Sequence, residues 1–390
     1  MKPFSFSAVP KSFFGEGCLL KIIDILKQEG KPQKVLLITG QSSFISSVNY
    51  TQLMEGLGQA GHQVVEARVA HEPSPELVDD ITNTTRSENA GLVIAVGGGS
   101  VLDTGKAVSA MVPVEGSVVD YLEGVGTKLH SGIKVPFIAV PTTSGTGSEA
   151  TKNAVLSRIG EKGFKKSLRH DRFIPDYALL DPLLSLHCPA LVTAASGMDA
   201  LNQLLEGYMS EKGNPLTEDL ALSGIQRILM SLERLCLEEP QNKDLRGQMA
   251  YAAYLSGLVL ANAGLGYVHG FAGVIGGFIE IPHGVVCGKL NGVLFEAVAR
   301  RVLQDPQSEA YRKLLKLSQM AVPHETKAGV QVDALIERLY RMEEVLNLPS
   351  FSSYGADEAL LKKAVSMTSR KECPVSLEEE TLVDLVLSKL

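Results

Sequence analysis

Several features that would place this chain in other classes of protein are missing from it. No stretch approaches the roughly 18 uninterrupted apolar residues that a membrane span needs, although 45% of the residues are hydrophobic. The net charge of −7 argues against a general nucleic-acid binder, which needs a basic surface for the phosphate backbone. The first residues lack the apolar core of a secretory signal. We therefore expect neither a membrane nor a nucleic acid as a partner.

Cysteine is also scarce, with five residues at positions 18, 188, 236, 287 and 373. Their number is odd, they are widely spread, and none forms a C-x-x-C pair. This pattern is typical of unpaired thiols in a reducing compartment rather than of a disulfide framework. We expect a cytoplasmic protein.

The chain has 390 residues, more than one core usually sustains, and its pattern changes near Pro189. Before this point, short apolar runs alternate with helical stretches, which predicts a Rossmann-like parallel sheet covered by helices. The predicted strands are 34–39, 63–68, 92–96, 136–140 and 177–180. After this point, long helical periods follow one another, and Ser376 with Glu379 suggests a capping box. We predict an α/β domain over 1–188 and an all-α domain over 189–390.

Two glycine- and hydroxyl-rich loops directly follow predicted strands, at Gly97–Ser100 and Pro141–Glu149. Glycine lets the backbone approach a ligand, and the helix expected after the first loop presents free N–H groups to a phosphate. Neither loop is a G-x-G-x-x-G or Walker A sequence, so each alone could be an ordinary strand–helix turn. Their repetition favours a dinucleotide site. Asp103 and Lys106 either line that site or form a structural i, i+3 pair.

Two histidines, His269 and His283, and a carboxylate, Asp199, come from three separate parts of the second half. Two imidazoles and one carboxylate are a plausible set of ligands for a single metal ion, with a position left for water or substrate. Hydrogen-bonded histidines without a metal are the alternative. A metal beside a nicotinamide would indicate redox chemistry on an alcohol or a carbonyl.

Four ordered motifs carry a family resemblance: Gly97–Lys106, Pro141–Glu149, Gly197–Leu201 and Asn262–Gly284. Together they resemble the iron-containing (group III) alcohol dehydrogenases, which are related to glycerol dehydrogenase and dehydroquinate synthase. The resemblance spans nearly the whole chain. It implies a dehydroquinate synthase-like architecture, NAD(P)(H) as cofactor, a divalent metal in a cleft between the two domains, and at least a homodimer.

Matching positions carry the family's roles onto this sequence. The resemblance implies that Asp199, His269 and His283 bind the metal and act in catalysis through it. It implies that the pyrophosphate is held by Gly97, Gly98, Gly99 and Ser100, that the nucleotide is lined by Thr142, Thr143, Thr151 and Asn153, and that Lys165 or its neighbour Lys166 lies near the ribose. From their places at the two loops we also expect Asp103 and Thr146 to contact the nucleotide.

Two departures from the family pattern concern the metal. A histidine that many members carry four residues after the aspartate is Gln203 here, and another, often assigned to proton relay, is Gly273. The Gln203 carbonyl could bind a metal weakly or contact substrate. A site with fewer imidazoles favours zinc or another divalent ion over tightly held iron.

The strand at 34–39 ends in Gly40, with Ser42 close behind. Relatives that prefer NAD often carry an acidic residue here, which would repel a 2′-phosphate. We therefore predict that NADP(H) is tolerated. Lys289 could meet an anionic substrate, although a solvated lysine is the simpler interpretation.

These observations predict an NAD(P)-dependent alcohol dehydrogenase or aldehyde reductase that acts on a small alcohol or aldehyde. Two alternatives remain open from the sequence. One is a lyase like dehydroquinate synthase, which also uses a nucleotide and a metal. The other is a non-catalytic nucleotide-binding descendant, which the two missing histidines suggest and the three retained ligands oppose.

Overall fold

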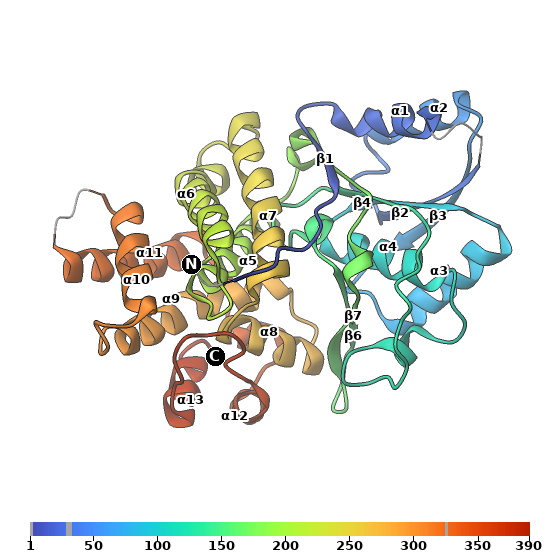
Figure 1. Ribbon diagram of the computed structural model, residues 1–390. Coiled ribbons are helices and arrows are strands. Elements are labelled where there is room, and N and C mark those ends of the chain that lie inside the picture. The colour runs from blue at the N-terminus through green and yellow to red at the C-terminus, as the bar shows by residue number, and fades with distance from the viewer. Residues whose placement is uncertain (1–2, 29–32, 324–326) are drawn as a thin grey trace. The chain divides into compact units, whose positions relative to one another are not determined.

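The computed structural model describes residues 3–28, 33–323 and 327–390, and it divides into two compact units (Figure 1). The α/β unit comprises Ser7–Arg158 and Lys165–Cys188. The helical unit comprises Pro189–Leu390, together with Ile159–Phe164 and the described residues up to Phe6.

The α/β unit contains a six-stranded sheet whose paired strands are all parallel. Each of the five strands predicted from apolar runs is present, and its bounds agree within one residue. The additional edge strand is short and mostly exposed, so it gave no apolar run to detect. The strands, in their order across the sheet, are β1 (Lys11–Phe14), β8 (Tyr177–Leu180), β5 (Phe137–Pro141), β4 (Leu92–Gly97), β2 (Lys34–Gly40) and β3 (Gln63–Val69).

Helices and a two-stranded sheet surround these strands: α1 (Lys21–Gln28), α2 (Val48–Gln59), α3 (Pro75–Ser87), α4 (Gly99–Met111), β6 (Asn153–Arg158) and β7 (Phe164–Arg169). Helix α3 begins at Pro75 because the Ser74 hydroxyl caps it by accepting from the Leu77 N–H and because proline is favoured in the first turn. Helix α4 is buried along most of its length and packs on β4, β5 and β6. The loop that precedes α4 is therefore held by the core.

The strand order places a topological switch between β2 and β4. The chain passes from β2 outward to β3 and then returns across β2 to β4, after which it continues to β5 on the other side. In open parallel sheets, ligands bind outside the carboxyl ends of the strands at such a switch. The loop after Gly97, which starts here, is one of the two glycine- and hydroxyl-rich loops of the sequence analysis, and the loop after Gly40 carries Ser42.

The helical unit contains α5 (Ala190–Met209), α6 (Pro215–Leu237), α7 (Lys243–Ala263), α8 (Tyr267–Phe278), α9 (His283–Val302), α10 (Glu309–Ala321), α11 (Ala328–Leu346), α12 (Glu358–Met367) and α13 (Glu379–Leu387). Helix α5 is buried almost throughout and packs against α6, α7 and α9. Asn214 and Thr217 form a capping box at the start of α6. The capping box predicted at Ser376 is wrong, because α13 is capped by Glu378 without a side-chain hydrogen bond.

Helix α8 was not predicted as a separate helix. Its sequence is rich in glycine and apolar on all sides, so it shows no amphipathic period. Gly264, with φ +73°, ends α7, and α8 continues at a bend of 97°. No single helix among the described residues has the length and apolar composition to cross a membrane, and α7 with α8 satisfies those two criteria only as this bent pair.

Candidate functional site

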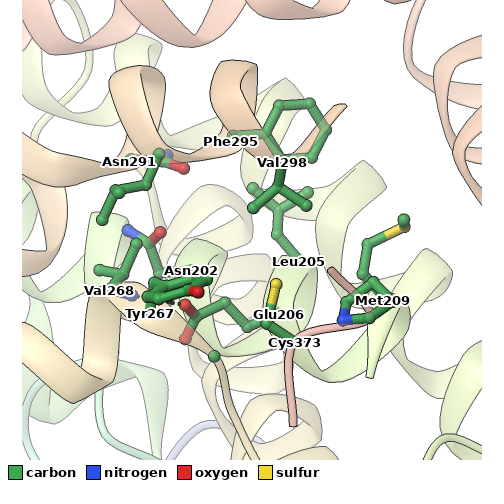
Figure 2. A pocket seen from close by; sticks show the side chains of 13 residues that line it. Asn202, Leu205, Glu206, Met209, Tyr267, Val268, Asn291, Phe295, Val298 and Cys373 are labelled. Atoms are coloured by element: carbon green, nitrogen blue, oxygen red, sulfur yellow. Dashed lines mark hydrogen bonds between the residues drawn. The ribbon is translucent and has the colours of Figure 1, made fainter. Parts of the chain in front are cut away.

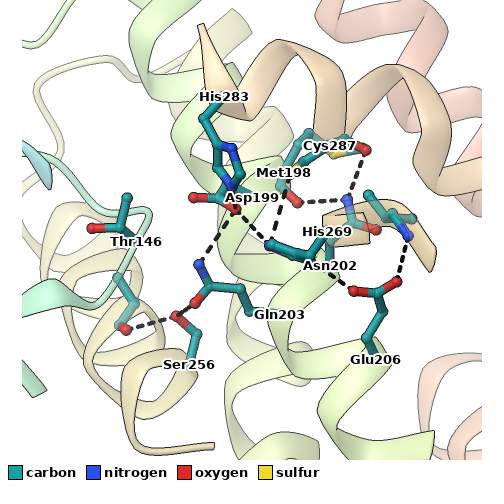
Figure 3. Close-up of polar contacts among 12 residues, drawn as sticks. Thr146, Met198, Asp199, Asn202, Gln203, Glu206, Ser256, His269, His283 and Cys287 are labelled. Atoms are coloured by element: carbon teal, nitrogen blue, oxygen red, sulfur yellow. Dashed lines mark hydrogen bonds and ion pairs between the residues drawn. The ribbon is translucent and has the colours of Figure 1, made fainter. Parts of the chain in front are cut away.

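Three helices of the helical unit bring four potential metal ligands together (Figure 3). Asp199 lies in α5, His269 in the first turn of α8, and His283 and Cys287 in the first two turns of α9. One ligand atom from each lies within 4.8 Å of those of the others. The Asp199 Oδ1 is 3.1 Å from His269 Nε2 and 3.7 Å from His283 Nε2. The structure thus unites the three predicted ligands and adds a cysteine.

Glycine lets α9 approach α5 closely enough to assemble this cluster. A Cβ at Gly284 would lie 2.2 Å from the Ala195 carbonyl oxygen, and one at Gly288 would lie 3.2 Å from Met198 Cβ. Both glycines are one turn apart on α9 and flank Cys287. Because no side chain separates the two helices here, the start of α9 reaches the turn of α5 that carries Asp199.

Glu206 holds His269 from the side opposite Asp199. Its Oε2 lies 2.7 Å from His269 Nδ1, and its Oε1 accepts the Val268 N–H at 2.7 Å. A carboxylate that binds Nδ1–H fixes the ring and leaves Nε2 directed at the metal position. The sequence analysis missed this residue, although the i, i+7 spacing from Asp199 puts both carboxylates on one side of α5.

The charges of this cluster are matched to a cation. Burial opposes ionisation of Asp199, but the His283 charge and the hydrogen bond from His269 together keep its pKa below the usual value. Burial likewise opposes ionisation of Glu206, and His269 holds its pKa low. Burial alone would lower the pKa of His269, yet the Cys287 sulfur and both carboxylates raise it well above its usual value. Buried anions on both sides of the His269 ring favour a positive charge there, as expected where a metal ion binds.

Gln203 lies one turn after Asp199 and is buried. Its Nε2 donates to Asp199 Oδ1 at 3.4 Å, and its Oε1 accepts from the Ser256 hydroxyl at 3.0 Å. Its carbonyl oxygen is thus directed to Ser256 of α7. Lys289, the other polar residue considered at the start of α9, forms an ion pair with Glu343 of α11 at 2.9 Å.

A pocket in the helical unit borders Glu206 without including any of the four potential ligands (Figure 2). Most of its lining is apolar, and Asn202 and Asn291 are among its polar members. Its residues are Asn202, Leu205, Glu206, Met209, Gly266, Tyr267, Val268, Asn291, Leu294, Phe295, Val298, Cys373 and Pro374. The pocket therefore borders Glu206, which holds His269, and is distinct from the metal cluster.

In the α/β unit, the two predicted phosphate loops contact each other. The Thr142 N–H donates to the Gly97 carbonyl at 2.9 Å. Gly98 caps α4, and a Cβ there would lie 3.3 Å from the Thr143 hydroxyl. A Cβ at Gly99 would lie 2.7 Å from Thr146 Cγ2. Side chains on the first loop would therefore clash with the second, and the N-terminus of α4, including Ser100, lies at the end of β4.

The remaining predicted nucleotide contacts are joined in an internal network. Lys106, 1% exposed, donates to Thr151 Oγ1 and to the Asn153 carbonyl, each at 2.8 Å. It also bonds both oxygens of Ser148. Asp103 accepts from the Ser148 hydroxyl and, at 2.9 Å, from the Val155 N–H. Lys106 therefore connects α4 to residues 148–153 through these hydrogen bonds.

Two further positions complete the predicted set. Lys165, near the start of β7, forms an ion pair with Glu72. Gly40 ends β2, and a Cβ there would have no heavy atom within 4 Å. Ser42 is exposed in the loop that follows. One strand away, Arg68 donates to the Thr39 hydroxyl at 2.7 Å, which brings a guanidinium to the end of β2.

Comparisons with known proteins agree with this arrangement. Residues 10–182 match the family model described as iron-containing alcohol dehydrogenase, and residues 193–388 match that of the C-terminal part of the Fe-containing alcohol dehydrogenase family. Alcohol dehydrogenase 4 of Saccharomyces cerevisiae (strain ATCC 204508 / S288c) is 30% identical over 384 residues, 97% of this chain and 96% of the yeast chain. The 1,3-propanediol dehydrogenase of Citrobacter freundii is 35% identical over 302 residues, 77% of this chain and 76% of its own. A crystal structure of 1,3-propanediol oxidoreductase superposes with a TM-score of 0.87 at 27% identity and covers all of both chains.

Proposed function

We propose that this chain, which belongs to the iron-containing alcohol dehydrogenase family, interconverts an alcohol and its aldehyde at the centre formed by Asp199, His269 and His283. As a member of this family, it is an oxidoreductase that acts on CH–OH groups with NAD(P)(H) and a divalent metal. The convergence of two imidazoles and a carboxylate within 4.8 Å in the helical unit carries the assignment of the site. The reaction transfers a hydride between the nicotinamide C4 and the carbonyl carbon.

The residues of the cluster divide the work. A divalent metal held here supplies Lewis-acid polarisation of the substrate oxygen. Asp199 contributes a buried negative charge, and Glu206 keeps the His269 ring oriented with Nε2 toward Asp199, so that both side chains would be able to hold the metal. Gly273 has no side chain that could relay a proton, so proton exchange at this position would fall to solvent.

The topological switch supports nucleotide binding at the loops after β2, β4 and β5. Glycines at 97–99 and the start of α4 offer backbone N–H groups to the pyrophosphate, and the hydroxyls of Thr142, Thr143 and Thr146 lie on the neighbouring loop. Gly40 brings no negative charge to the end of β2, and Arg68 lies beside it. These two features support tolerance of the 2′-phosphate of NADP(H).

We also propose a substrate class, a cellular location and an oligomeric state. Relatives that act on alcohols and diols support a small alcohol or aldehyde as substrate. None of the five cysteines, all of which lie in the described residues, forms a disulfide, and this supports a reducing, cytoplasmic location. The edge strand β1 exposes Phe14, with Val9 close before it. An edge strand has one side on which another chain can pair, which supports a homodimer.

The test is a panel of alcohols and aldehydes assayed with both cofactors, with added zinc, iron or manganese, and with a chelator. We expect reversible, metal-dependent formation of NAD(P)H. Asp199→Ala and His283→Ala should each lower kcat by about 10²-fold or more and leave the Kd of the nucleotide unchanged. Turnover of a substrate without net formation of NAD(P)H would indicate a lyase, and near-normal rates in either variant would contradict the assigned site.

A further inference from the structure

Gln203, at the position where many family members carry a fourth metal ligand, does not direct a ligand atom at the metal position. Gln203 directs its amide N–H at Asp199 and its carbonyl oxygen at Ser256. The opposite orientation of the amide would place its oxygen against the Asp199 carboxylate oxygen, which repels it. An N–H group cannot bind a metal, so Gln203 orients Asp199 instead.

A different side chain approaches the cluster from α9. Cys287 is fully buried, and its Sγ lies 3.8 Å from His269 Nε2. Its sulfur belongs to the same group of atoms within 4.8 Å as the donors of Asp199 and both histidines. Among the cysteines, all of them described, Cys287 is the one that joins three other potential ligands.

Contacts between α5 and α9 fix the backbone of Cys287. The side-chain amide of Asn202 donates to the Cys287 carbonyl at 2.9 Å and to the Met198 carbonyl at 3.0 Å, and so it ties α9 to α5 next to Asp199. Gly284 and Gly288 permit the close packing on either side of Cys287. The sulfur is therefore positioned by the same contacts that position the carboxylate.

We propose that Cys287 is the fourth protein ligand of the metal, and that the resulting Asp199, His269, His283 and Cys287 set selects zinc over ferrous iron. This inference rests on the metal site of the proposed function. Thiolate is a soft ligand that zinc favours, and a coordinated thiol loses its proton, here to solvent, as the sulfur–metal bond forms. Zinc in catalytic sites also accepts a fifth ligand, so four protein donors leave room for substrate.

Cobalt substitution provides the test, because Co²⁺ takes the place of Zn²⁺ and a cobalt–thiolate bond gives an intense charge-transfer absorption in the near ultraviolet. The protein would be stripped with a chelator and titrated with Co²⁺. We expect one equivalent to bind to the wild type with this absorption. Cys287→Ser should lose the absorption and bind Co²⁺ and Zn²⁺ at least about tenfold more weakly. Cys373→Ser is the matched control, because Cys373 is also a buried thiol whose pKa burial raises to about 12 but lies outside the cluster.

A second measurement needs no variant. X-ray absorption of the wild-type zinc enzyme should show one sulfur at about 2.3 Å. Binding of one equivalent of Co²⁺ without the charge-transfer band, and a zinc shell of only nitrogen and oxygen, would overturn the role of Cys287 and leave the proposed function intact. Failure of the wild type to bind either metal would overturn the metal site itself. Equal affinity in the wild type and Cys287→Ser would also contradict the proposal.

Discussion

The nucleotide loops and the metal cluster are built in opposite ways. The loops consist of consecutive residues at strand ends, and they use backbone N–H groups and the absence of side chains. The cluster consists of side chains from α5, α8 and α9, and residues of each helix are fixed by contacts from another. A site made of backbone tolerates changes of side chain outside its glycines, whereas a site made of remote side chains depends on helix packing and on supporting hydrogen bonds.

The largest expected effect concerns the support of the metal cluster. Glu206→Gln removes the charge that binds His269 Nδ1–H and places an amide N–H against one of its two N–H donors, so we expect metal affinity to fall about 10–100-fold. Titration with Zn²⁺ against a competing chelator measures this. Glu211→Gln, on an exposed residue paired with Arg370, is the control. An unchanged zinc affinity in Glu206→Gln would mean that the carboxylate does not position the ring.

The next effect tests the backbone site. Gly99→Val places a branched side chain where even a Cβ would lie 2.7 Å from Thr146 Cγ2, and such overpacking costs about 1–3 kcal/mol. We expect the Kd of NAD(P)H to rise about tenfold or more, with metal content unchanged. Fluorescence titration with NADH and metal analysis of the same sample measure both quantities. Gly58→Val, at a position with no heavy atom near the added Cβ, should leave cofactor affinity unchanged.

A smaller effect concerns the choice of cofactor. Gly40→Asp introduces a carboxylate at the end of β2 without a steric clash. Like charges brought together in a binding site are unfavourable, so the ratio of kcat/KM for NADP to that for NAD should fall about tenfold. If the ratio stays the same, the adenosine ribose does not bind beside residue 40.

The smallest effect concerns stability. Burial raises the pKa of Glu149 from 4.5 to about 7. The folded state therefore binds this proton more tightly than the unfolded state, and stability is lost as pH rises from about 4.5 to about 7. Glu149→Gln has no such loss, so its Tm should exceed that of the wild type by about 2–4 °C at pH 8 and by less at pH 5. Calorimetry at both values checks this, and a gain that does not depend on pH would exclude Glu149 as the titrating group.

Features built from consecutive residues were predictable from the sequence. Five of the six strands of the sheet and both glycine loops appear in consecutive residues, so local patterns were sufficient to predict them. Most of the long helices also show their own period, although α10 was not predicted. Helix α8 and the capping of α13 were not predictable in this way, because α8 has no polar face and Glu378 replaces the expected Ser376.

The three proposed metal ligands came from motifs in the sequence. Their companions Glu206 and Cys287 were missed because their relation to Asp199 and His269 arises only when α5, α8 and α9 pack together. The orientation of the Gln203 amide is set by the Asp199 carboxylate on one side, and the Ser256 hydroxyl that it contacts on the other side lies 53 residues later in the chain. Spacing along a helix could have suggested both, because Glu206 lies seven residues after Asp199 and Cys287 lies four residues after His283.

Lys106 gives the loop region a built-in reporter. Its ammonium group is buried and bonded to four oxygens from residues 148–153, and burial lowers its pKa to about 8. Once uncovered, this amine would react with acylating reagents as an exposed lysine does, whereas the closed loop shields it. The rate at which Lys106 is labelled thus measures how often residues 148–153 separate from α4, and a nucleotide that stabilises these loops should slow that labelling.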